Sequence, residues 1–179
     1  MQFYDIAVFV HVLGVIALFG GFIIHHRAGA RLRAASTVEE ASPWFGLIDA
    51  TKEMFPGGLL MLLVSGIYMT YLRWRSMPPF IVVGLVAWVV IMICGAVFAA
   101  RQSRSIKAAL AGTSGSLTES QRVVIHDRMP WLVVAVLNGM ALGLVFLMST
   151  KPSLLVSLVS LVVPALAGVF VGASVLKRP

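Results

Sequence analysis

Long apolar stretches alternate with short charged segments along the whole chain, and this pattern predicts membrane-spanning helices. Five stretches contain no Asp, Glu, Lys or Arg, namely residues 6–26, 54–72, 76–100, 129–150 and 152–176. Each can supply the ~20 apolar residues that cross a hydrocarbon core about 30 Å thick. We therefore expect an all-α, polytopic membrane helix bundle with five transmembrane helices, at about residues 4–26, 54–72, 79–100, 130–149 and 153–176.

Composition supports this fold class. Hydrophobic residues make up 59% of the 179 residues and charged residues 12%, whereas soluble domains have roughly 45–50% and about 25%. The spans and their short connections use nearly the whole chain, so we expect residues 1–179 to form a single integral membrane domain.

The distribution of basic residues predicts the orientation. With five spans, successive connections lie alternately on the two sides of the membrane. One side receives three basic residues, Arg73, Arg75 and Lys151, and the other receives eleven: Arg27, Arg31, Arg33, Lys52, Arg101, Arg104, Lys107, Arg122, Arg128, Lys177 and Arg178. The positive-inside rule places the eleven in the cytoplasm, with the N-terminus outside and the C-terminus inside. The net charge of +7 then reflects topology and attraction to the lipid bilayer, and we expect no nucleic-acid binding.

The first span and the connection after it carry local signals. Asp5 precedes the first apolar stretch and Arg27 follows it, which is the reverse of a signal peptide, so we expect this span to be retained. In the connection, residues 37–40 form a capping-box pattern that can satisfy exposed helix amides. Pro43 should interrupt that helix, and the apolar residues among 44–48 predict a short interfacial helix before the second span.

Small and polar residues predict breaks and packing. Residues 112–116 are rich in Gly and Ser and should form a flexible break. The GxxxG patterns at 139–143 and 168–172 offer small faces for close helix contact. Ser65 and Asn138 lie near the middle of their spans, where hydrogen bonds between helices are the expected role.

His11 is the residue that most strongly indicates chemistry, because it lies inside the first span. At 1.5 Å per residue it is roughly 8–10 Å below the outer end of the helix. An ionisable side chain at that depth is costly without a partner and marks a functional candidate. Two interpretations stay open: a ligand or proton-handling residue, or a neutral imidazole bonded to a neighbouring hydroxyl or carbonyl.

The other histidines raise the hypothesis of a haem. His25 follows His11 by fourteen residues, nearly four turns, so both lie on one face, with Gly14 and Gly21 flanking it. This spacing is similar to that of membrane cytochromes b, in which histidines on one helix hold two haems and glycines let the macrocycle approach the backbone.

Haem iron takes axial imidazole or methionine ligands, and the predicted topology limits which residues can pair. His25 or His26 shares a side with His126, so one bis-histidine site is allowed there. His11 would pair with a methionine or leave a coordination position open. The methionines that end spans on its side are Met69 and Met148. We therefore predict haem b at His11, His25, His26 and His126, with His11 and His126 on iron. The alternative for the pair at 25–26 is an interfacial polar cap that ends the helix.

Three segments resemble bacterial membrane families. Residues 10–14, with the glycines at 20–21, resemble the first helix of copper-resistance D proteins and of HemJ-type protoporphyrinogen oxidases. Residues 55–68 and 146–153 resemble a bacterial family of integral membrane proteins with no assigned function. The resemblance implies a multi-pass protein of the bacterial inner membrane, and the HemJ-type similarity implies haem on His11. HemJ-type proteins also rely on an intramembrane lysine, and none of the spans here contains one, which counts against the oxidase activity.

Together these observations predict a small inner-membrane protein that binds haem b and serves in electron transfer or redox chemistry. The alternative is a cofactor-free accessory or scaffold subunit, which packs against other membrane proteins or copies of itself. A metal or small-solute permease comes third, because polar groups are scarce within the spans. No catalytic residue is indicated, and whether the chain is an enzyme stays open.

Overall fold

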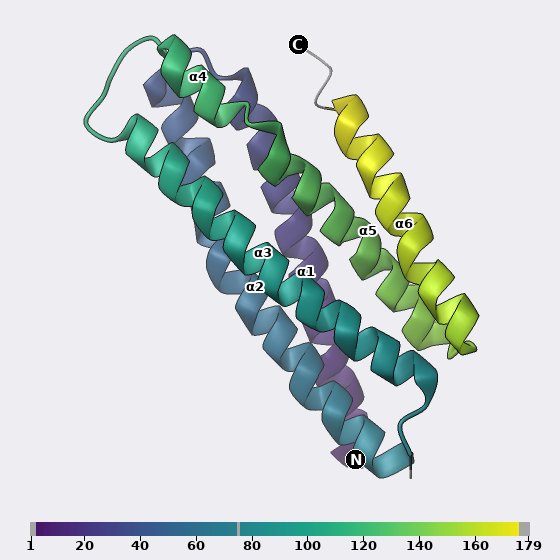
Figure 1. Cartoon of the computed structure of the whole chain (residues 1–179). Coiled ribbons are helices and arrows are strands. Elements are labelled where there is room, and N and C mark those ends of the chain that lie inside the picture. Colours follow the sequence, from purple (N-terminus) through teal and green to yellow (C-terminus); the bar gives the residue numbers. More distant parts are fainter. Residues whose placement is uncertain (1–2, 75, 176–179) are drawn as a thin grey trace. The chain divides into compact units, whose positions relative to one another are not determined.

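The computed structural model describes residues 3–74 and 76–175, and its regular elements are helices (Figure 1). In order they are α1 (Phe3–Ala34), α2 (Val38–Arg73), α3 (Pro79–Leu110), α4 (Glu119–Ile125), α5 (Arg128–Thr150) and α6 (Leu154–Val175). Five helical segments of the described chain are long and apolar enough to cross a membrane, with α4 and α5 counted as one segment. The predicted all-α class is therefore confirmed, with five helical segments that could cross a membrane.

Several helices continue well past the predicted spans. The helix α2 has 36 residues, which at 1.5 Å per residue is about 54 Å, against a hydrocarbon core of about 30 Å. It runs through Pro43 and Pro56 without a break, so the predicted interruption at Pro43 and the separate interfacial helix are wrong. A proline removes one amide hydrogen bond, but Pro43 is exposed while Ala41 and Ile48 of the same segment are buried. Side-chain packing on the opposite face keeps this segment helical.

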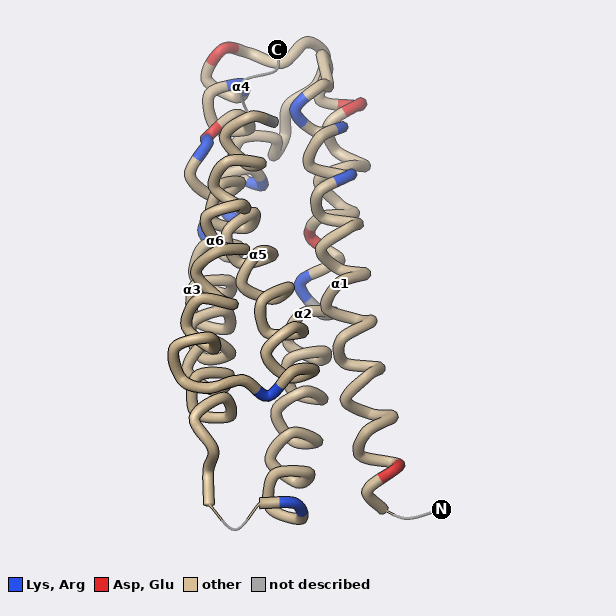
Figure 2. Tube along the Cα trace, turned by 90° about the vertical axis from the view of Figure 1, so that its right-hand side faces the viewer, with Lys and Arg blue, Asp and Glu red and all other residues tan. Residues whose placement is uncertain are grey.

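Contacts divide the chain into two compact parts. The first comprises α1, α2, the end of α3 from residue 100, and α4. Most of its charged residues gather at the end where α1 and α2 are joined (Figure 2). We call this end, residues 28–53 and 100–127, the polar head. There the end of α1, the start of α2, the end of α3 and the short α4 form an ordered layer beyond the apolar spans. The sequence did not suggest this layer.

The two turns of the polar head bond to each other. The Val38 amide donates to the Gly115 carbonyl at 2.9 Å, and the Leu117 amide donates to the Ser36 carbonyl at 3.0 Å. Gly115 has a φ of +82°, which a residue with a Cβ rarely adopts. Residues 112–116 thus form an ordered turn that pairs with the α1–α2 connection. The prediction of a flexible break there is wrong, because both glycines adopt the positive φ that the turn requires.

The second part comprises residues 74–99 and 128–179, of which the structure describes all but 75 and 176–179. In it α5 and α6 form an antiparallel hairpin (Figure 1). A Cβ on Gly139 would overlap the Pro164 carbonyl, and one on Gly143 would overlap the Ser160 carbonyl. Because residue 164 is proline, the Ser160 carbonyl has no helical amide four residues on, and Gly143 lies directly against it. The close contact predicted for the GxxxG faces is confirmed.

Candidate functional site

His11 bonds to the neighbouring span of the first part. Its Nδ1 lies 3.0 Å from Ser65 Oγ on α2. The Ser65 hydroxyl donates to the Met61 carbonyl at 2.5 Å, so its one proton is already used and its oxygen is the acceptor for His11. The imidazole then carries its proton on Nδ1, and Nε2 keeps an electron pair. This is the hydroxyl partner foreseen in the second interpretation of His11, and Ser65 has the interhelical role predicted for it.

The glycines on the same face of α1 contact α2. A Cβ on Gly14 would lie 2.9 Å from the Gly58 carbonyl oxygen, and one on Gly58 would lie 3.1 Å from the Gly14 carbonyl oxygen. A Cβ on Gly21 would lie 3.1 Å from the ring of Phe55. These glycines let two helices approach each other closely. In this structure α2 occupies the space beside these glycines, and a macrocycle on this face stays a prediction.

His25 lies on that closed face and His26 lies off it. The His25 side chain is 4% exposed, with its ring 6.5 Å from the Phe55 ring in an edge arrangement. Phe22 packs against the same ring at 5.1 Å between centroids, with the two rings tilted by 47°. His26 is exposed. The helix continues through both residues to Ala34, so they do not cap its end, and the predicted polar cap at a helix terminus is wrong.

His126 ends α4 on the exposed side of the polar head. Its Nδ1 donates to the Arg122 carbonyl at 2.9 Å, and its own amide bonds the same carbonyl at 2.9 Å. The helix α4 packs against α1. The His126 ring, however, bonds to its own helix and caps the C-terminus of α4. Within the described residues there is no group of three or more His, Cys, Asp or Glu side chains arranged to hold a metal ion. The pairing of His25 or His26 with His126 stays a prediction.

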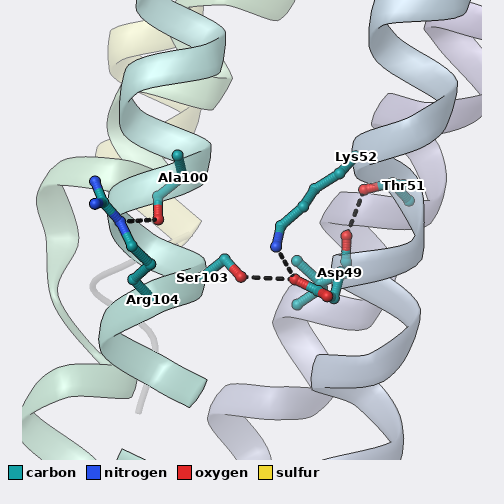
Figure 3. Close-up of polar contacts among 7 residues, drawn as sticks. Asp49, Thr51, Lys52, Ala100, Ser103 and Arg104 are labelled. Carbon is teal, nitrogen blue, oxygen red and sulfur yellow. Dashed lines mark hydrogen bonds and ion pairs between the residues drawn. The ribbon is translucent and has the colours of Figure 1, made fainter. Parts of the chain in front are cut away.

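The polar head contains a hydrogen-bonded group that the sequence did not single out (Figure 3). Asp49 of α2 accepts a hydrogen bond from the Ser103 hydroxyl of α3 at 2.6 Å and forms an ion pair with Lys52. The hydrogen bond from Lys52, followed by that from Ser103, holds the pKa of Asp49 below its usual range. The group ties α2 to the end of α3. Its signal in the sequence is one carboxylate three residues before a lysine, which is too common to be diagnostic.

Two helix N-termini with capping-box patterns complete the polar head. Of the predicted one the hydroxyl half is confirmed, since the Glu40 amide donates to Thr37 Oγ1 at 3.2 Å; the Glu40 carboxylate accepts from the Ser36 amide at 2.8 Å instead of from the Thr37 amide that a capping box requires. The second was missed, although it has the same pattern: Thr118 and Gln121 cap α4 reciprocally. The Gln121 side chain also donates to the Ala109 carbonyl at 2.8 Å, which fixes α4 to the end of α3.

Comparisons with protein-family models, with curated proteins and with solved structures found no match for the chain.

Proposed function

We propose that the chain is a protein of the bacterial inner membrane with its N-terminus outside and its C-terminus in the cytoplasm. The support is the basic excess on one set of connections and the gathering of charges at the polar head (Figure 2), together with the positive-inside rule. A reporter active only in the cytoplasm should be active when fused after Pro179 and silent when fused after Arg75. The opposite pattern would overturn this orientation.

Within that membrane we propose that the chain acts as a cofactor-free accessory or scaffold subunit. The observation that carries this proposal is the closed α1–α2 face: Gly14 against Gly58, and Gly21 and His25 against Phe55. These contacts occupy the face on which the histidine spacing had suggested a cofactor. The ordered polar head then supplies a rigid surface outside the apolar spans for contact with other proteins.

The polar side chains within the spans support a structural role over transport. The hydroxyls of Ser65, Thr70 and Ser157 each donate to a carbonyl of their own helix, at 2.5, 2.8 and 2.9 Å. The same holds for Ser160, at 2.8 Å. A solute pathway needs polar groups that face the solute and replace its water. Hydroxyls bonded to their own backbone do not offer that, so the geometry does not favour a permease.

The scaffold proposal is tested by the size of the complex at native expression level. The tagged chain, extracted in a mild detergent and separated by native electrophoresis, should run as a discrete species larger than the monomer. Gly58→Ala should disperse that species, because the new Cβ would meet the backbone of α1 at 3.1 Å. Gly57→Ala is the matched control, since its Cβ would meet nothing within 4 Å. A wild-type chain that runs only as a monomer would count against a subunit role.

A b-type haem on His11 is the second candidate, and one observation favours it. The Nδ1 hydrogen bond to Ser65 leaves the Nε2 electron pair, and imidazoles that bind metals commonly donate their other nitrogen to a nearby acceptor. Such a group would supply one-electron transfer, and the similarity to HemJ-type proteins implies a haem at this histidine. In this candidate His11 is the ligand, and Ser65 fixes its orientation. Bands of b-type haem in the purified protein would separate it from the scaffold proposal.

A further inference from the structure

One face of α1 is exposed along the whole span and ends in two arginines. Phe9, Ile16 and Ile23 are spaced by seven residues, nearly two turns, and are 62%, 61% and 64% exposed. Arg27 and Arg31, one turn apart, continue the same face beyond the apolar residues and are exposed. We call this set, with Gly20, the α1 stripe. It lies away from the α2 contact, where Gly14, Leu18 and Phe22 are buried.

Gly20 makes a notch in the α1 stripe. A Cβ placed on it would meet no atom within 4 Å, whereas one on its neighbour Gly21 would meet the Phe55 ring at 3.1 Å. Packing against α2 thus explains why residue 21 is a glycine, but it does not explain why residue 20 is one. Ile16 and Ile23 flank the notch on the exposed side. From Ile16 to Arg27 the helix rises about 16 Å, close to the roughly 15 Å depth of one leaflet of the hydrocarbon core.

The arginines at the end of the stripe have no described carboxylate as partner. The nearby described carboxylates of α2 are bonded elsewhere: Asp49 to Lys52 and Ser103, Glu39 to the Gly115 amide, and Glu40 to the Ser36 amide. Two guanidinium groups one turn apart can hold one phosphate, for which arginine offers several donors. Charge complementarity at the edge of the apolar span therefore calls for an anion that also has an apolar body.

We propose that the α1 stripe binds one anionic phospholipid. An acyl chain lies in the notch at Gly20 between Ile16 and Ile23, and Arg27 and Arg31 hold the phosphate. The leaflet is the cytoplasmic one if the proposed orientation is correct. Binding itself does not depend on orientation or on the scaffold role.

The test is a lipid titration of the full-length purified chain, followed by native mass spectrometry. Wild-type protein should retain phosphatidylglycerol in preference to phosphatidylcholine. Arginines near a membrane surface each contribute about fivefold to anionic lipid binding. The double variant Arg27→Gln/Arg31→Gln should therefore weaken phosphatidylglycerol binding about 25-fold. The matched control is Arg101→Gln/Arg104→Gln, which removes the same charge from exposed positions on α3 and should change binding less than about twofold.

Two results of this titration would overturn the proposal. One is an equal loss in the control pair, which would mean general electrostatic attraction. The other is wild-type binding that does not distinguish the two lipids. Gly20→Leu gives an independent arm, because it fills the notch without touching α2 and should weaken binding while the helical content stays unchanged. A photoreactive residue in place of Ile23 should crosslink to lipid in native membranes, and crosslinking to a polypeptide instead would also refute a lipid site.

Discussion

Replacing Gly143 by alanine tests the packing of the α5–α6 hairpin most sharply. The new Cβ would overlap the Ser160 carbonyl oxygen and would also lie 3.0 Å from the Ser160 carbonyl carbon. Both atoms belong to the backbone, so no side-chain rotation relieves the overlap and the two helices must separate. Overpacking of this kind costs about 1–3 kcal/mol. Separation also loses the contact between the Gly143 Cα and the Ser160 carbonyl, worth about 0.5–1 kcal/mol.

The matched control is Gly95→Ala on α3 in the same part. Its Cβ would make ordinary contact with Leu137 at 3.7 Å. Both positions are helical, so the gain of about 0.5–1 kcal/mol from replacing a helical glycine is common to the two variants. Their free energies of unfolding should therefore differ by about 1.5–4 kcal/mol. Circular dichroism during a titration from mild detergent into sodium dodecyl sulfate measures this difference. Equal stability of the two variants would refute the direct backbone contact.

Three further predictions concern the first part. In a double-mutant cycle with His11→Ala and Ser65→Ala, the coupling energy should be about 0.5–1.5 kcal/mol, typical of hydrogen bonds between membrane helices. A coupling energy of zero would contradict the hydrogen bond between His11 Nδ1 and Ser65 Oγ. The depressed pKa of Asp49 stabilises the fold fully above the unfolded pKa of about 4, and this contribution is lost as pH falls through the lower folded value. The protection factors of the polar-head amides, corrected for intrinsic exchange, should therefore fall below about pH 4, and Asp49→Asn should flatten that dependence. Gly115→Ala places a Cβ on a residue with a φ of +82° and should destabilise the polar head by about 1–2 kcal/mol. Gly46→Ala, with open space around its Cβ, should not destabilise it. Equal protection of the two variants in hydrogen exchange would contradict the role of Gly115 in the turn.

The spans were predictable because the bilayer imposes one requirement on sequence. A segment without charges and about 20 residues long must satisfy its backbone polar groups internally, and a helix does so. The helix ends were not predictable, since outside the apolar core they depend on contacts between distant residues. The bond from Ser103 to Asp49 and the pairing of Gly115 with Val38 hold them together. Neither pair leaves a periodic pattern in the sequence.

The glycines of α1 show why the candidate site was harder to predict. Gly14, Gly20 and Gly21 look alike in an apolar stretch, yet two contact α2 and one lies open. Their roles depend on which side of the helix the neighbouring span occupies, and the spacing of histidines does not encode that. The same holds for His11, whose partner Ser65 is 54 residues away. A resemblance to haem-binding families directed attention to this face of α1, and a haem on it stays a prediction.

The measurement that most directly tests the structural role of the α1–α2 face is the reduced-minus-oxidised absorption spectrum of the full-length protein. The wild-type chain should be expressed with ample haem, purified in a mild detergent and compared with His11→Ala. If the α1–α2 face is closed by packing and the role of His11 is its hydrogen bond to Ser65, neither protein shows a Soret band or the sharp reduced bands of b-type haem. Both should remain folded by circular dichroism. Stoichiometric haem bands in the wild type that vanish in folded His11→Ala would contradict this account and establish His11 as an iron ligand.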